Sequence, residues 1–100
     1  MIKINGFQVA PAELEAAILA FEGVRDVAVV GAGQGVEERG VGFLILEEGV
    51  GGLDEEGLRR FLRERLAGFK VRGLEVRVLE GGLPRSGVGK VLRGSLREMV

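Results

Sequence analysis

Hydrophobic and polar residues alternate with a period of two at the start of the chain. Ile2-Lys3-Ile4 and Phe7-Gln8-Val9 flank the dipeptide Asn5-Gly6. Asn-Gly between two alternating runs is a strong hairpin signal, because both residues accept the positive φ angles of a tight type I′ turn. The pattern therefore predicts a β-hairpin within residues 2–9.

Three later segments carry apolar residues at helical spacing. The first begins at Pro11, which suits the first turn of a helix, and ends at Gly23. The second begins after Asp54, an N-cap residue, and ends at Gly68. The third runs from about Val91 to Met99. The apolar faces expected to be buried are Leu14, Ala17, Ile18 and Phe21 in the first helix, Leu58, Phe61, Leu62 and Leu66 in the second, and Leu92, Leu96 and Met99 in the third.

Three β-branched and apolar runs predict strands at residues 24–30, 41–46 and 74–79. The first two are joined by a glycine-rich, charged segment at residues 31–40. The resulting order is hairpin, helix, strand, strand, helix, strand, loop and helix. We expect one α+β domain over residues 1–100, with a small sheet, an N-terminal β-hairpin and three packed helices.

Composition excludes several kinds of chemistry. The 100 residues contain no His and no Cys, so a Ser-His-Asp triad, a thiol nucleophile and a zinc site with the usual ligands cannot form. A net charge of −1 argues against bulk nucleic-acid binding. No apolar run reaches transmembrane length and no signal peptide is evident. Together with the lack of Cys, this leads us to expect a cytoplasmic protein without a metal site of its own.

The segment Leu83-Pro84-Arg85-Ser86-Gly87-Val88-Gly89-Lys90-Val91 predicts a flexible loop that ends at the start of a helix. Gly87 and Gly89 would permit positive φ angles, while Arg85 and Ser86 would add donors for a phosphate or carboxylate near Lys90. Only three of the 14 basic residues are lysines, which mildly supports a special role for this one. A solvated loop with a surface lysine explains the same pattern about equally well.

Two nucleotide-binding motifs are excluded by spacing. A Walker A loop requires a glycine where Pro84 stands and a hydroxyl residue where Val91 stands. Gly31 and Gly33 begin a dinucleotide fingerprint, but Val36 takes the place of its third glycine. We therefore expect Gly31 and Gly33 to be turn residues between antiparallel strands.

Three separate segments nevertheless resemble one family. The run from Ile2 to Glu15 resembles the segment after the interdomain hinge of adenylate-forming enzymes, closest to coumarate–CoA ligases and firefly-type luciferases. Leu66-Ala67-Gly68-Phe69-Lys70-Val71 and the Leu83–Val91 loop resemble two further family motifs, in the expected order. The resemblance covers almost all of residues 1–100 but only the smaller, C-terminal domain of that family.

The resemblance implies a two-step reaction in which a carboxylic acid and Mg·ATP give an acyl-adenylate, and CoA then displaces AMP. Lys90 matches the lysine that bridges the acid and the α-phosphate during adenylation. Lys3 and Gln8 match positions that contact the adenylate. The Asn5-Gly6-Phe7 turn matches backbone that lines the CoA tunnel after the domain rotates, and Lys70 is expected to be structural. Mg²⁺, ATP and the acid would be held by a large N-terminal domain that is missing from these residues.

Some features leave alternatives open. Asn5 stands where close relatives often have Lys, and the family's hinge Asp or Lys is missing. The sequence does not determine which acid is activated. The expected function is that of a C-terminal domain of an acid–CoA ligase, inactive alone. The alternatives are part of an enzyme that adenylates amino acids for a carrier protein, or a free-standing regulatory or interaction module.

Overall fold

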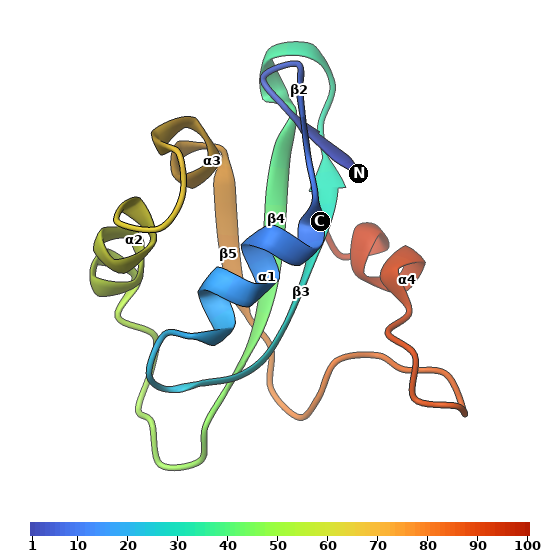
Figure 1. Ribbon diagram of the computed structural model, residues 1–100. Helices are drawn as coiled ribbons and strands as arrows, with labels where there is room; N and C mark the ends of the chain where they lie inside the picture. Colours follow the sequence, from blue (N-terminus) through green and yellow to red (C-terminus); the bar gives the residue numbers. More distant parts are fainter.

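A computed structural model describes all of residues 1–100 and confirms the α+β class. Two β-sheets and four α-helices form the domain (Figure 1). In chain order the elements are β1 Ile2–Ile4, β2 Phe7–Val9, α1 Pro11–Leu19, β3 Val24–Ala32, the 3₁₀ turn η1 Gly35–Glu37, β4 Arg39–Leu46, α2 Glu55–Arg63, α3 Gly68–Arg72, β5 Leu74–Val78 and α4 Arg93–Glu98. None of the helices combines the length and the apolar composition that a membrane-spanning helix requires.

The predicted N-terminal hairpin is confirmed. Strands β1 and β2 pair antiparallel, with Lys3 directly opposite Gln8. Asn5 and Gly6 adopt φ angles of 51° and 82°, as the tight turn requires. The hairpin lies beside one end of the larger sheet, with Ile4 and Val9 buried against the domain.

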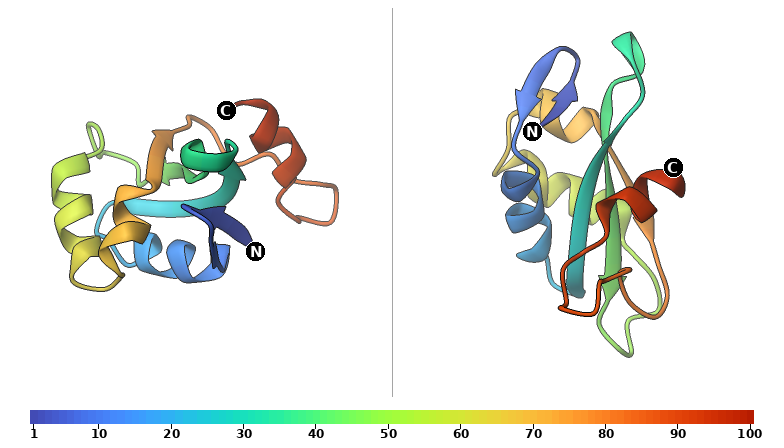
Figure 2. Two further views of the ribbon diagram at one scale, coloured as in Figure 1. Left: turned by 90° about the horizontal axis from the view of Figure 1, so that it is seen from above. Right: turned by 90° about the vertical axis from the view of Figure 1, so that its right-hand side faces the viewer.

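The larger sheet has the strand order β3-β4-β5, antiparallel between β3 and β4 and parallel between β4 and β5. Helices α1, α2 and α3 cover one face, and α4 covers the other (Figure 2). Successive side chains of β3 point to opposite faces of the sheet, as in any β-strand. Val27 and Val29 join the core under α1 and α2, whereas Ala28 and Val30 join a smaller core with Leu83 and Leu96.

The helix ends differ from the sequence prediction. Helix α1 ends at Leu19, and Gly23 instead forms a turn into β3 with a φ of 98°. Asp54 caps α2 as expected, accepting a hydrogen bond from the Gly57 N–H at 3.0 Å. The prediction that α2 extends to Gly68 was wrong, because it ends at Arg63 and Gly68 begins the separate helix α3. The domain therefore has four α-helices where three were expected.

The last helix also begins later than predicted. Residues 84–86 pair with residues 90–92 before α4 starts: the Leu92 N–H donates to the Pro84 carbonyl at 2.8 Å. This pairing keeps Val91 out of the helix, so α4 begins at Arg93. Leu96 is fully buried as expected, but Leu92 and Met99 are exposed, contrary to prediction.

Candidate functional site

The loop that carries Lys90 is a small hairpin closed by its own hydrogen bonds. The Ser86 N–H donates to the Lys90 carbonyl at 2.8 Å, and the Lys90 N–H donates to Ser86 Oγ at 3.3 Å. The Gly89 N–H donates to the Ser86 carbonyl at 2.9 Å, with Gly89 at a φ of 87°. Arg85 and Val91 form a bridge at the base. The backbone on both sides of Lys90 is therefore fixed within the loop.

These contacts correct the predicted helix N-terminal anion site. Helix α4 has six residues and begins three residues after Lys90, and the Lys90 N–H is already bonded to Ser86. Arg85 is not a free donor, because its guanidinium bonds to the Gly89 carbonyl at 2.9 Å and to the Asp26 carboxylate at 2.6 Å. Gly87 does not adopt the positive φ that we expected of it. The positive charge of this loop is thus carried by the Lys90 side chain rather than by backbone amides.

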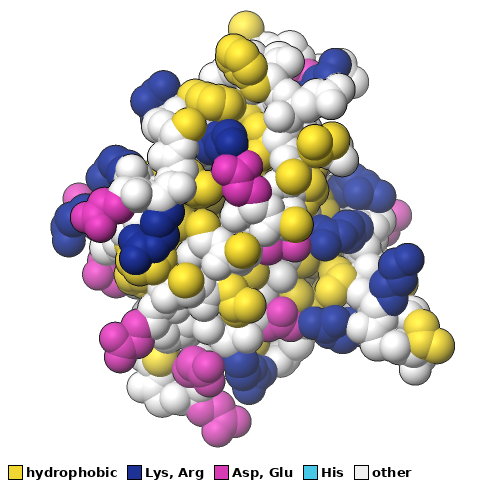
Figure 3. Space-filling model, viewed as in Figure 1, with side chains coloured by type: hydrophobic (Ala, Val, Ile, Leu, Met, Phe, Trp, Pro, Cys, Tyr) yellow, Lys and Arg dark blue, Asp and Glu magenta, His cyan; other side chains and the backbone are white.

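The Lys90 ammonium has no ion pair or hydrogen bond within the domain. Residues 81–97 contain four basic residues and no acidic one. Two of the four are neutralised, Arg85 by Asp26 and Arg93 by Glu15 at 2.9 Å. Figure 3 shows Lys and Arg side chains gathered on the side of the molecule that holds α4 and the connection before it. An exposed, unpaired ammonium in such surroundings attracts anions.

The tip of the loop is open to solvent. Val88 is 91% exposed, and a Cβ added at Gly87 or Gly89 would meet no atom within 4 Å. At the base, Leu83 is buried and Val91 packs against the same small core. The loop thus combines an anchored base with a free tip that projects from the body of the domain (Figure 1).

The N-terminal hairpin brings together the second group of predicted residues. Lys3 and Gln8 are cross-strand partners with exposed side chains on the same face of the hairpin. Asn5 and Gly6 form the turn next to them, and Phe7 is 61% exposed. The Phe7 ring packs against Phe69 of α3, with a centroid distance of 5.0 Å.

The two groups of predicted residues do not meet. The β1–β2 hairpin lies at one end of the domain, and the loop of residues 84–92 lies toward the other end (Figure 1). Figure 2 shows the same separation from a second direction. Lys90, Arg85, Ser86, Gly87 and Gly89 form one unit, and Lys3, Asn5, Gly6, Phe7 and Gln8 form another. The domain therefore offers two distinct surfaces rather than one site.

Two residues that hold these surfaces were missed by the sequence interpretation. Glu38 accepts a hydrogen bond from the Gly6 N–H at 2.9 Å, and Asp26 accepts one from Arg85. Their partners lie 32 and 59 residues away in sequence, so local spacing could not reveal them. The one available signal was an aspartate inside an apolar strand, Val24-Arg25-Asp26-Val27.

Lys70 has the structural role that we expected, although it lies on α3 rather than at the end of α2. Its ammonium bonds to both oxygens of the Glu13 carboxylate, at 2.8 and 2.9 Å. Of the three lysines, this one is committed to an ion pair that ties α3 to α1.

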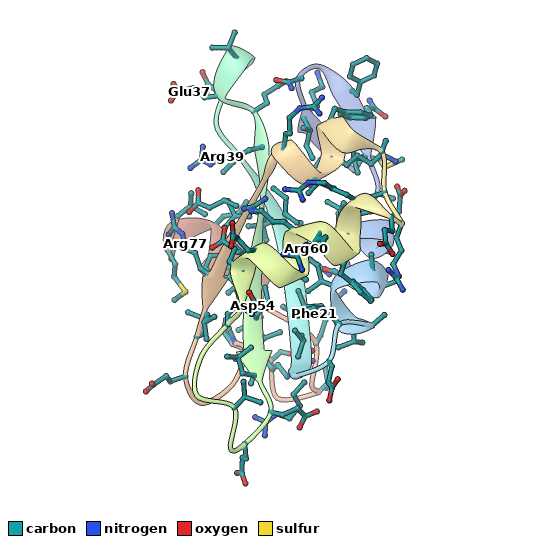
Figure 4. All side chains as sticks on the ribbon, turned by 90° about the vertical axis from the view of Figure 1, so that its left-hand side faces the viewer. Phe21, Glu37, Arg39, Asp54, Arg60 and Arg77 are labelled. Carbon is teal, nitrogen blue, oxygen red and sulfur yellow. The ribbon has the colours of Figure 1, made fainter.

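A further charged cluster joins β4 and β5, and its Arg39 lies near the N-terminal hairpin, where it lines a hollow together with Asn5. Glu75 accepts hydrogen bonds from Arg77 at 2.6 Å and from Arg39 at 3.0 Å. These bonds, that from Arg77 first, hold the pKa of the Glu75 carboxyl below its ordinary value, against desolvation, which raises it. Arg39 and Arg77 project on the same side of the domain (Figure 4). The cluster links two strands and contains no unpaired group.

Lys90 does not line any of the three main hollows of the surface. One of about 430 Å³ lies beside the hairpin and is lined by Asn5, Val36, Glu37, Glu38, Arg39, Arg72 and Gly73. A more apolar hollow of about 280 Å³ lies near Phe21 and Asp54 (Figure 4). No three acidic side chains come close enough to hold a metal ion.

The fold is a small α+β domain with an exposed lysine loop toward one end and an exposed hairpin turn at the other. The sequence model of the AMP-binding enzyme C-terminal domain matches residues 13–90. The chain therefore belongs to the AMP-binding enzyme C-terminal domain family, as the resemblance predicted. The matched region ends on Lys90 itself.

Individual relatives give the same result. A long-chain-fatty-acid–CoA ligase of Escherichia coli O6:H1 is 39% identical over 98 residues, which are 98% of this chain and 17% of that protein. The acyl-CoA ligase clz12 of Cochliobolus lunatus is 36% identical over 100 residues, covering all of this chain and 28% of the relative. The crystal structure of apo MatB from Rhodopseudomonas palustris superposes with a TM-score of 0.85 at 33% identity, over 98% of this chain and 19% of that one. The chain thus spans less than a third of the length of each of these proteins.

Proposed function

We propose that these 100 residues act as the C-terminal domain of an ATP-dependent carboxylic acid–CoA ligase, working with a larger domain that binds ATP and the acid. The observation that carries the proposal is the unpaired Lys90 ammonium, held on a hydrogen-bonded loop at the end of the family match. The two curated relatives described above are both named as CoA ligases, which favours CoA over a carrier protein as the thiol acceptor.

In the first step, Lys90 would reach into the larger domain and bind the anionic oxygens of the acid and the α-phosphate. Negative charge on these groups is redistributed as the carboxylate attacks and pyrophosphate leaves. A cation placed there stabilises the transition state more than the separated substrates, which is the requirement for catalysis. The lysine carries no partner that it would have to leave before binding them.

In the second step, the other surface would face the larger domain. Lys3 and Gln8 present an ammonium and an amide side by side, suited to the adenylate. The Asn5-Gly6 turn lacks a side chain at Gly6, so the thin pantetheine arm of CoA could pass close to its backbone. Because the two surfaces lie at different ends of the domain, they would serve different steps only if the domain reorients between them.

The substrates implied are ATP, CoA and a small-molecule carboxylic acid, with Mg²⁺ held by the larger domain. The acid would be selected by that larger domain. The proposed location is the cytoplasm. A free-standing regulatory or interaction module is the competing function.

The proposal is tested by comparing the isolated chain with a two-domain enzyme that contains it. The isolated chain, folded as a monomer or weak oligomer, should release no pyrophosphate above background from ATP and a panel of carboxylic acids. The two-domain enzyme should release pyrophosphate and then form an acyl-CoA. Turnover by the isolated chain would contradict the domain assignment, and an inactive two-domain protein would favour the non-catalytic module.

A further inference from the structure

One side-chain hydrogen bond joins the Lys90 loop to the central sheet. Among residues 84–92, every side-chain hydrogen bond but one stays within the loop. The exception runs from the Arg85 guanidinium to the Asp26 carboxylate on β3, at 2.6 Å. Asp26 therefore links the loop to β3 and can fix how the loop is oriented relative to the sheet.

Asp26 is itself held in place by the strand. The regular pairing of β3 with β4 shifts between Val24 and Asp26. Such an irregularity re-aims a side chain from a strand. Asp26 Oδ1 accepts a hydrogen bond from the Val27 N–H at 2.9 Å, which leaves Oδ2 for Arg85.

Arg85 connects Asp26 to Gly89, the residue before Lys90. One guanidinium nitrogen bonds to Asp26, and another donates to the Gly89 carbonyl at 2.9 Å. That carbonyl belongs to the peptide unit that joins Gly89 to Lys90. The order of contacts is therefore β3, Asp26, Arg85 and then the peptide preceding Lys90.

Without the Arg85–Asp26 bond, the loop would keep its internal conformation, but its orientation relative to the sheet would no longer be fixed. The hydrogen bonds between Ser86 and Lys90 close the loop internally, and its tip touches nothing else. Leu83 and Val91 would still pack at its base, and Arg93 directly after it would still donate to the Val29 carbonyl at 2.7 Å, but these contacts hold the base of the loop and not the part that carries Lys90. A displacement of about 1 Å in a reacting group can cost roughly a hundredfold in rate, so direction matters here.

We propose that Asp26 is a positioning residue for Lys90, acting through Arg85 to aim the lysine loop for the adenylation step. This inference rests on the proposed function of Lys90. Asp26 touches no substrate in this account and plays no part in the thiol step, which would use the hairpin at the other end of the domain.

The pair is not needed to hold the fold together. Its side chains are 41% and 36% exposed, and ion pairs at such positions add little to stability. Loss of the pair should therefore leave a folded protein with a misdirected loop. The effect of the pair on adenylation can therefore be measured separately from its effect on stability.

The test uses the two-domain enzyme with Asp26→Ala, Arg85→Ala and Lys90→Ala, singly and with Asp26→Ala added to Lys90→Ala. Adenylate formation and the reaction of a supplied acyl-adenylate with CoA are measured separately. Asp26→Ala and Arg85→Ala should each slow adenylate formation about tenfold or more, within the range that misplacement produces. The CoA step and the melting temperature should stay close to the unmutated values. Exchanging the charges, with Asp26→Arg and Arg85→Asp together, should restore part of the lost rate.

The variant that combines Asp26→Ala with Lys90→Ala shows whether Asp26 acts through Lys90 or affects adenylation independently of it. If Asp26 acts through Lys90, Asp26→Ala should slow adenylation no further once Lys90 is alanine. Glu13→Ala is the matched control, because it breaks the ion pair with Lys70, far from the loop, and should not slow adenylation selectively.

Two results would overturn the proposal in different ways. If Lys90→Ala slows adenylation but Asp26→Ala does not, or if the two effects multiply, the positioning role is wrong and the function of Lys90 stands. If Lys90→Ala itself leaves adenylation unchanged, the proposed function of the loop fails and the role of Asp26 fails with it.

Discussion

The carboxylate of Glu38 accepts a hydrogen bond from the backbone N–H of Gly6 at 2.9 Å, across 32 residues of sequence. Glu38 follows the 3₁₀ turn between β3 and β4, so this bond ties the tip of the N-terminal hairpin to the central sheet. The hairpin otherwise depends on Ile4, buried beside the turn, on Val9, buried at the open end, and on the Phe7–Phe69 contact. Glu38 thus fixes the turn that we propose to line the CoA path.

Removal of this contact should affect the second half-reaction. In a two-domain enzyme, Glu38→Ala frees the Gly6 N–H and loosens the turn, at a stability cost of about 1 kcal/mol or less because the bond is exposed. The reaction of a supplied acyl-adenylate with CoA should slow several-fold, while adenylate formation remains near its unmutated rate. Stopped-flow measurement of the two steps checks this, and equal slowing of both would contradict it.

Gly6→Leu should obstruct the same step more strongly. A Cβ at Gly6 would meet no atom of the domain within 4 Å, so the side chain would occupy the space that we assign to the thiol arm. The φ of 82° adds backbone strain of about 1–2 kcal/mol.

Gly49→Leu is the matched control for that strain, because Gly49 has a φ of 87° and equally open surroundings. The two variants should lose similar stability, but only Gly6→Leu should raise the KM for CoA or lower the rate of thioester formation. Similar kinetics in both variants would mean that the effect at Gly6 is a folding defect.

The Glu75 cluster predicts a pH dependence of stability. Because its arginine partners lower the folded-state pKa of Glu75, the unfolded chain binds its proton more readily. The stabilising contribution is therefore fully present above the unfolded-state pKa and is lost as the pH falls through the lowered folded-state pKa. Urea unfolding across acid and neutral pH should show a smaller difference between Glu75→Gln and the unmutated protein at the acid end. A difference that grows toward acid pH would contradict the assignment.

The elements with strong local signals were predictable from sequence. Asn5-Gly6 determined the hairpin and its register, and Asp54 determined the start of α2. The apolar face of α1 was also correct, with Leu14 and Ile18 fully buried. In each case the deciding interaction lies within a few residues of the signal.

The errors came from interactions between distant or competing segments. Pairing of residues 84–86 with 90–92 displaced the start of α4, although the spacing of Val91, Leu92 and Leu96 suits a helix. The anchoring of Arg85 by Asp26 could not be seen, so Arg85 was interpreted as a ligand-binding donor. The sequence also singled out Lys90, but the structure does not place it at a helix N-terminus. It is an ammonium left unpaired while its neighbouring arginines are neutralised.

The rate of adenylate formation in Lys90→Ala directly measures the proposed role of Lys90. In a two-domain enzyme containing residues 1–100, this substitution should slow adenylation by about a hundredfold or more, the usual cost of removing one well-placed donor from a transition state. A supplied acyl-adenylate should still react with CoA at close to the unmutated rate. Lys70→Ala, which breaks an ion pair with Glu13, should change both steps modestly or not at all. An unchanged adenylation rate in Lys90→Ala, or equal loss in both steps matched by Lys70→Ala, would contradict the adenylation role of Lys90.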